Sequence, residues 1–131
     1  MADFPREERL SCKKDIDRLF AEGNAFVAYP LRVIYLEEAV DGRWPAGVRV
    51  MISVPKKRIR RAVGRNRIKR LVRETYRLNK SELVESCRQS NKYLHVAFTY
   101  LSDEILLYRN IEKAMHKAMK NLFGKENIVN V

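Results

Sequence analysis

The first half of the chain alternates between helical and strand-like spacing of its apolar residues. An apolar stripe that ends at Gly23 predicts a helix over residues 11–22, because its apolar positions fall on one helix face. β-Branched and aromatic residues dominate 25–29 and 31–37, with Pro30 between them, a composition typical of strands at an edge or a bend. We expect one bent strand or two short strands in this region.

The second half carries two further strand patterns and a long amphipathic helix. Apolar and polar residues alternate over 48–54, as far as Pro55, and again over 94–100, with the period of a half-buried strand. The Ser-Asp-Glu sequence at 102–104 then provides a cap for the last helix. The apolar stripe of that helix consists of Ile111, Ala114, Met115, Ala118, Met119 and Leu122.

Between these two strand patterns lies a helix with two contrasting faces. Its apolar positions recur at the spacing of one helix face, so we expect a helix that begins near Arg61 and ends around 78–80. Gly64 lies within its first turns, where either the close approach of a partner backbone or a packing constraint would explain a glycine. The apolar face consists of Ile68, Leu71, Val72, Thr75 and Tyr76; the opposite face consists of Asn66, Lys69, Arg70, Arg73 and Arg77, flanked by Arg65 and Arg67.

These elements together predict an α+β fold in the order α-β-β-β-α-β-α. Strands that are joined through a helix favour a two-layer sandwich, in which the last helix buries one face of the sheet. The first helix and the exposed sheet surface would then border a groove. We expect a single domain over 1–131, with its ordered part at roughly 7–123.

The charge of the chain is concentrated in one segment. Lys and Arg total 27 against 16 Asp and Glu, which gives a net charge of +11 and a pI near 10.0. Residues 56–80 contain twelve of these cations and a single anion, Glu74, so this segment supplies the whole excess. Solvating surfaces mix charges of both signs, and such a run favours a polyanionic partner or an anionic membrane surface.

Several other classes of protein are disfavoured by the sequence. No apolar stretch is long enough to span a bilayer and the first residues lack the apolar core of a signal peptide, so we expect a cytoplasmic protein with no membrane partner. Cys12 and Cys87 stand alone, and neither His95 nor His116 has metal-ligand spacing to them, so a protein-bound metal is not expected. No nucleophile motif or phosphate-binding glycine loop predicts catalysis or a small-molecule substrate.

One run of residue types within the basic segment is highly specific. Residues 56–77 read Lys-Lys-Arg-Ile-Arg-Arg-Ala-Val-Gly-Arg-Asn-Arg-Ile-Lys-Arg-Leu-Val-Arg-Glu-Thr-Tyr-Arg. This run is similar to the signature of the bacterial ribonuclease P protein family, in which Lys-Lys and Ala-Val precede Arg-Asn-Arg-x-Lys-Arg-x-x-Arg-x-x-aromatic-Arg. The resemblance extends over most of the chain and is weakest after Leu78.

The resemblance implies that the protein assists a catalytic RNA. In that family the RNA subunit cuts the 5′ leader from precursor tRNA with bound magnesium ions, and the protein supplies no catalytic residue and binds no cofactor of its own. The Arg-Asn-Arg helix would dock on the ribonuclease P RNA. The residues expected to contact RNA are Lys56, Lys57, Arg61, Arg65, Asn66, Arg67, Lys69, Arg70, Arg73 and Arg77.

The resemblance also implies a groove for the single-stranded 5′ leader of precursor tRNA. Ile16, Phe20 and Tyr35 would line it, between the first helix and the sheet. Aromatic rings stack on unpaired bases without demanding a sequence. Ile16 stands where relatives often carry an aromatic residue. Phe20 fits the core equally well, and Tyr35 alternates with Ile34 and so can face either side of the sheet.

Three alternatives remain beside this interpretation. A small ribosomal or ribosome-assembly protein would also be short, basic and α+β, although it would lack the register from Lys-Lys to Arg-Asn-Arg. A free-standing protein nuclease would cleave precursor tRNA without an RNA partner. A membrane-surface role is disfavoured, since the exposed helix face has few bulky apolar residues.

Overall fold

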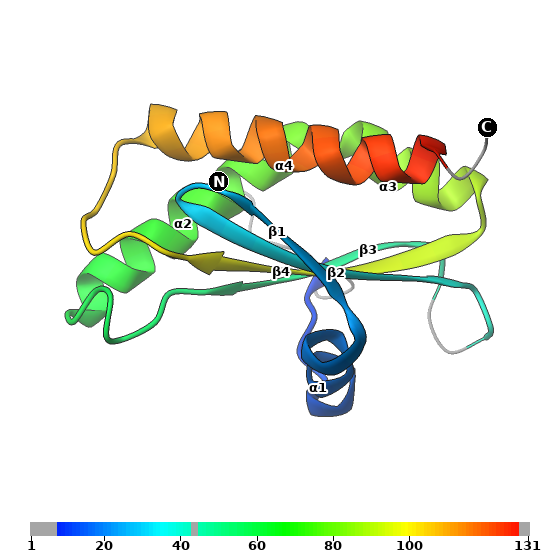
Figure 1. Ribbon diagram of the computed structural model, residues 1–131, viewed down its shortest axis with the longest axis horizontal. Helices are drawn as coiled ribbons and strands as arrows, with labels where there is room; N and C mark the ends of the chain where they lie inside the picture. Colours follow the sequence, from blue (N-terminus) through cyan, green and yellow to red (C-terminus); the bar gives the residue numbers. More distant parts are fainter. Residues whose placement is uncertain (1–7, 43–44, 129–131) are drawn as a thin grey trace.

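The computed structural model describes residues 8–42 and 45–128, with side chains as far as residue 123, and contains a mixed sheet with helices on both faces (Figure 1). The predictions that concern residues 1–7 and 129–131 lie outside the described residues. The elements are α1 (Lys13–Glu22), β1 (Asn24–Ala28), β2 (Leu31–Ala39), β3 (Gly47–Ser53), α2 (Ala62–Asn79), α3 (Ser81–Gln89), β4 (Lys92–Tyr100) and α4 (Tyr108–Ile128).

The four strands form one sheet in the order β1-β2-β4-β3. β1 and β2 form an antiparallel hairpin, β2 pairs antiparallel with β4, and β3 pairs parallel with β4. The parallel pair is possible because α2 and α3 carry the chain back between β3 and β4. At the β3 edge, the segment before α1 adds a short bridge, in which the Leu10 backbone N–H donates to the Val50 carbonyl at 2.9 Å.

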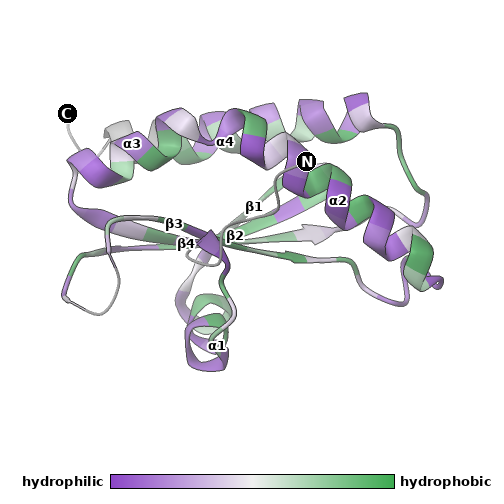
Figure 2. Cartoon of the chain, turned by 180° about the vertical axis from the view of Figure 1, so that it is seen from behind, coloured by the Kyte–Doolittle hydropathy of each residue, from purple (hydrophilic) through white to green (hydrophobic). Residues whose placement is uncertain are grey.

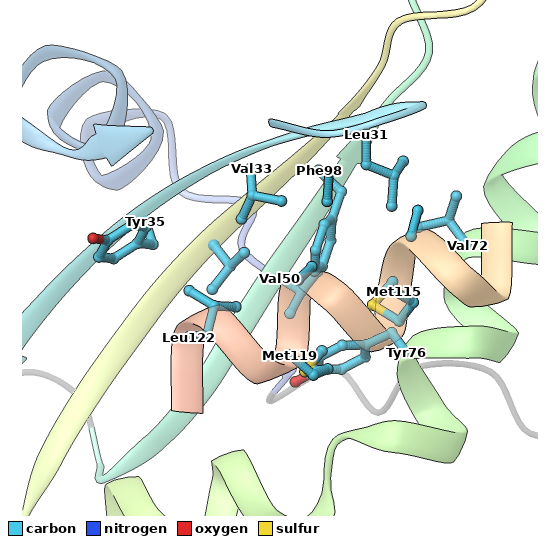
Figure 3. Packing of buried hydrophobic residues seen from close by; sticks show 14 of the residues in the cluster. Leu31, Val33, Tyr35, Val50, Val72, Tyr76, Phe98, Met115, Met119 and Leu122 are labelled. Atoms are coloured by element: carbon cyan, nitrogen blue, oxygen red, sulfur yellow. The ribbon is translucent and has the colours of Figure 1, made fainter. Parts of the chain in front are cut away.

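Helices α2, α3 and α4 cover one face of the sheet and enclose the larger core (Figures 1 and 3). The predicted apolar stripe of α4 is buried throughout, as is most of the apolar face of α2. The ring of Tyr76 packs against that of Phe98 on β4, with 6.1 Å between the ring centroids. Burying a large apolar side chain contributes about 1.5–3 kcal/mol, so α2 is firmly anchored along this face.

Helix α1 lies on the opposite face of the sheet and encloses a smaller core (Figure 1). Leu19 from α1 packs there with Ile34 of β2 and Ala97 of β4, and all three are buried. β4 is therefore covered on both faces. Its apolar–polar alternation indicated only one buried face, and the burial of His95 and Ala97 corrects that prediction.

The α+β sandwich predicted from sequence is confirmed, with one helix added to the element order. The observed order is α-β-β-β-α-α-β-α, because α3 follows α2 directly. α3 has a short stripe with only Leu83 and Cys87 buried, too little apolar periodicity to mark a separate helix in the sequence. The cap expected at 102–104 is also corrected: the Ser102 hydroxyl accepts the Glu104 N–H at 3.0 Å in a local turn, and α4 begins later.

Candidate nucleic-acid interface

The basic face of α2 is held outward by the burial of the opposite face. Ile68, Val72 and Tyr76 are fully buried, which fixes the rotation of the helix about its axis. Figure 2 shows the resulting separation of hydrophobic and hydrophilic flanks along α2. The α2 basic face consists of Asn66, Arg67 and Arg70, which are exposed, and Lys69 and Arg73, which are half-buried.

The N-terminus of α2 lacks the groups that normally stabilise a helix start. Arg61 occupies the N-cap position with extended backbone and no side-chain cap hydrogen bond, and the first turn contains no acidic residue. The backbone N–H groups of a first turn carry a partial positive charge and favour anions. The cations that precede this helix add to that charge, so an external anion is favoured at this end.

A basic loop (residues 56–61) joins β3 to α2 and continues the positive surface. Lys56, Lys57 and Arg61 are exposed, as predicted for RNA contacts. The loop begins with a tight turn, in which the backbone N–H groups of Arg58 and Ile59 both donate to the Pro55 carbonyl, at 3.0 and 3.2 Å. The basic loop and the α2 basic face therefore adjoin at the start of the helix.

Ion pairs neutralise some cations of the basic segment but not those of the α2 basic face. Arg58 pairs with Asp103 at 3.3 Å, and Lys80 pairs with Glu8. Among the described residues, no ion pair is formed by the cations of the α2 basic face, which are Arg67, Lys69, Arg70 and Arg73. Charges that remain unneutralised by the protein are available to a polyanion.

Arg77, which the sequence predicts to contact RNA, is paired within its own helix. Its guanidinium donates to both carboxylate oxygens of Glu74, with Nη2···Oε1 at 2.5 Å and Nε···Oε2 at 3.2 Å. This hydrogen bonding lowers the pKa of Glu74 and raises that of Arg77. The single anion of the basic segment thus offsets the charge of a cation one turn further along the same helix.

Arg65, another predicted RNA contact, is directed back toward the chain that precedes it. Its Nη1 group donates to the carbonyl oxygens of Ile59 and Arg60, at 3.0 and 2.7 Å, and the side chain is half-buried. The neighbouring Gly64 is explained by a packing constraint, one of the two explanations that the sequence allowed. A Cβ atom there would lie 2.9 Å from Ile59 Cγ2 and 3.1 Å from Ile105 Cδ1.

The three residues predicted to line a leader groove do not lie together. Ile16 is half-buried in the smaller core beside α1, and Phe20 on the same helix is 49% exposed. Tyr35 lies on the other face of the sheet, in the larger core, where it is 8% exposed and its ring lies 6.0 Å from that of Phe26 (Figure 3). A common groove for all three is therefore wrong, and Ile34 takes the α1-facing position.

The strand register identifies other side chains on the sheet face that carries α1. Ile34 and Ala97 contact α1, and residues two positions away on each strand share that face. In the strand register, Arg32 of β2 lies opposite Val27 of β1 on one side and opposite Thr99 of β4 on the other. Thr99 in turn lies opposite Ser53 of β3. We call this row the α1-side strip: Val27 and Arg32 are exposed, and Ser53 and Thr99 are half-buried.

The orientation of α1 turns Phe20 toward the α1-side strip. Arg18 pairs with Glu38, which lies at the far end of β2 from Arg32. At 3.6 residues per turn, Arg18 and Phe20 project from α1 in directions about 200° apart. Phe20 therefore faces the half of the sheet that carries Arg32. By this argument an exposed aromatic ring lies over the same half of the sheet as a cation and two hydroxyl groups.

A buried polar cluster beneath α1 was not recognised in the sequence. His95 is 3% exposed on β4, next to Asp15, which is 6% exposed on α1. Burial lowers the pKa of His95 to about 4, against an opposing effect of the Asp15 charge. The strand pattern gave no signal for the cluster, because its two members come from different elements, β4 and α1.

The described residues offer no site for a metal ion. No group of three or more His, Cys, Asp or Glu side chains among them is arranged to hold one. Within the same part of the chain, no helix is both long enough and apolar enough to cross a membrane. Cys12 is exposed and Cys87 is buried, and in the described part of the chain neither forms a disulfide.

Comparison with known proteins identifies relatives of the whole fold. The family model described as Ribonuclease P matches residues 4–123. The "Ribonuclease P protein component" of Porphyromonas gingivalis is 44% identical over 119 residues, which span 91% of this chain and 85% of the relative. Its namesake from Chlorobaculum tepidum is 34% identical, across 92% and 83% of the two chains. The structure of the RNase P protein from Thermotoga maritima superposes with a TM-score of 0.68 at 24% identity, across 87% of this chain and 96% of that one.

Proposed function

The chain belongs to the ribonuclease P family as the protein component of that enzyme, and from this premise we propose how its surfaces divide the RNA between them. It is a subunit of an endoribonuclease that processes the 5′ end of precursor tRNA, and its partner is the ribonuclease P RNA. In our proposal the α2 basic face and the basic loop dock on that RNA. The α1-side strip and Phe20 hold the 5′ leader.

The concentration of unneutralised charge on one rigid helix supports the docking role of α2. Arginine presents a planar fork of donors that matches phosphate oxygens, and an exposed asparagine such as Asn66 can reach a base edge or a 2′-hydroxyl. The helix does not have to order itself on binding, since its apolar face is already buried. Each phosphate contact releases counterions, so the affinity should fall steeply with salt.

The chemistry of the α1-side strip supports its role as the leader site. A leader is single-stranded, and its unstacked bases can stack on an exposed ring such as that of Phe20. Arg32 would neutralise a backbone phosphate, while the hydroxyl groups of Ser53 and Thr99 can donate to phosphate or sugar oxygens. None of these contacts reads a particular base. The site therefore fits leaders of varied sequence.

The described residues do not fit a magnesium site, and we derive no step through a metal held by the protein. Guanidinium and ammonium groups dominate the basic surface, whereas magnesium requires oxygen ligands, usually carboxylates. We propose that the RNA subunit holds the magnesium ions and carries out the cleavage. The protein then acts by reducing the repulsion between two polyanions. The family further implies that it does so in the cytoplasm.

Site-specific crosslinking tests the division of surfaces directly. Arg67→Cys on α2 and Phe20→Cys on α1, each made in a Cys12→Ser background, provide single exposed thiols for a photoreactive reagent, because Cys87 is buried. In the assembled enzyme with precursor tRNA, we expect position 67 to crosslink to the ribonuclease P RNA and position 20 to the leader.

The matched control is Lys117→Cys on α4, an exposed position that belongs to neither proposed surface. It should crosslink to neither RNA segment. If position 20 crosslinks only to the RNA subunit, or position 67 only to the leader, the proposed division is wrong.

A further inference from the structure

The basic loop concentrates like charges in a short connection. Five of its six residues are cations, Ile59 being the exception. Like charges at this density repel one another and favour extended, mobile conformations. A loop that moved freely would lose much of its conformational entropy each time it bound RNA. Some contact within the protein must therefore hold the basic loop if it is to meet RNA in one shape.

Arg65 makes that contact from the second turn of α2. The two hydrogens of its Nη1 group are directed to two consecutive carbonyls, those of Ile59 at 3.0 Å and Arg60 at 2.7 Å. Both carbonyls belong to the loop, just before the helix begins at Ala62. A charged donor forms stronger hydrogen bonds than a neutral one, and a guanidinium can supply both bonds from one nitrogen.

The packing around these bonds fixes the same part of the loop. Ile59 is buried, 7% exposed, and its Cγ2 atom lies where a Cβ at residue 64 would be. Gly64 thus allows the loop to lie against α2 at the level where Arg65 reaches it. The Arg58–Asp103 pair also attaches the loop, but it is solvent-exposed and contributes little.

We propose that Arg65 is a positioning residue, which holds the basic loop in the shape that meets RNA and leaves the gripping of phosphates to its neighbours. This inference rests on the proposed docking of α2 on RNA, but its structural part concerns the protein alone. Arg65 and Arg67 have the same side chain and stand two residues apart. They differ because Arg65 is half-buried and donates to two loop carbonyls, whereas Arg67 is exposed.

Amide hydrogen exchange in the free protein tests the structural part. The Arg58 and Ile59 amides donate to the Pro55 carbonyl. Compared with the unmodified protein, they should exchange about tenfold faster in Arg65→Ala and at the same rate in Arg67→Ala. The amides of β4 report that each variant is folded. In the unmodified protein, the Arg65 guanidinium should give separate, slowly exchanging Nη signals in nitrogen-15 spectra. Loop amides that exchange alike in both variants, or a freely rotating Arg65 guanidinium, would overturn the inference.

Affinity for ribonuclease P RNA, measured as a function of salt, tests the functional part. Arg65→Ala should weaken binding about tenfold with the slope of log affinity against log salt unchanged, since no phosphate contact is lost. Arg67→Ala should reduce that slope by about 0.7–0.9. An equal reduction for Arg65→Ala would make it a phosphate ligand and overturn the positioning role, as would unaltered affinity. If the unmodified protein fails to bind this RNA, the proposed function fails, while hydrogen exchange still decides the structural part.

Discussion

At the scale of single residues, neighbouring cations in one motif have different surroundings. Arg67 is exposed on α2, Arg77 is paired with Glu74, and Arg65 is bonded to the loop before the helix. Residue type and spacing cannot separate these cases, because each side chain is an arginine on the polar side of the same helix. The partners are set by the local folding of the chain, which the sequence pattern does not describe.

Arg67→Ala should weaken assembly with ribonuclease P RNA by about 1–3 kcal/mol, as is typical of a lost charged contact. The physical reason is the loss of one exposed cation that no anion of the described residues neutralises. Filter-binding titrations measure the change, with Lys117→Ala on α4 as the control for loss of a positive charge elsewhere. Equal affinities for Arg67→Ala and the unmodified protein would remove Arg67 from the interface.

His95 should make the stability of the protein depend on pH. Its pKa is about 4 when folded and near 6.5 when unfolded, so the unfolded chain binds more protons as the pH falls. The free energy of unfolding should therefore decrease between about pH 6.5 and 4, by at most about 1.4 kcal/mol per pH unit from this group. The charged groups that face His95 are Asp15 and Arg18 on α1, Glu38 on β2 and Arg49 on β3.

Urea denaturation at a series of pH values measures this dependence. His95→Asn should flatten the curve over that range, whereas His116→Asn, made at an exposed position on α4, controls for the loss of a histidine as such. Parallel curves for His95→Asn and the unmodified protein would show that His95 is not a source of the dependence.

At the scale of elements, the sequence predicted the helices and strands that have a clear apolar periodicity. It did not predict features that depend on which elements pack against one another. The boundaries and faces of α2 were predictable, because a long segment with a strict apolar stripe fits only one helix orientation. The face of Tyr35 was not, because residues 33–36 of β2 are apolar at consecutive positions and so show no alternation. α3 was missed because it is short and has few buried residues.

The two faces of the sheet predict opposite effects for two aromatic residues. Phe20→Ala should weaken binding of precursor tRNA by about 1–3 kcal/mol and leave mature tRNA unaffected, since stacking on the leader is lost. Tyr35→Ala should instead lower the free energy of unfolding by about 3 kcal/mol, because it empties part of the larger core. The affinity of the assembled enzyme should then change equally for precursor tRNA and mature tRNA.

Competition binding of precursor and mature tRNA, together with thermal denaturation, distinguishes these outcomes. Leu78→Ala, which truncates another exposed apolar residue at the far end of α2, is the control for Phe20→Ala. Selective loss of precursor binding in Tyr35→Ala, without loss of stability, would contradict the assignment of the two faces.

At the scale of the whole molecule, the fold holds the two proposed RNA-binding surfaces apart. The sheet and two cores hold α1 and α2 on opposite faces, so that two segments of RNA can be contacted without competing for the same surface. The basic segment supplies the entire net charge, and the remainder of the chain is neutral. Both the charge distribution and the family were predictable from sequence. The position that we propose for the leader site required the strand register.

Single-turnover cleavage of a precursor tRNA at low magnesium tests the central claim most directly. The protein alone, the ribonuclease P RNA alone and the two together are compared under one condition. We expect efficient cleavage at the mature 5′ end only in the mixture, because in our proposal the RNA carries out the reaction and the protein supplies positive charge. Cleavage by the protein alone, or a mixture no faster than the RNA alone, would contradict the account.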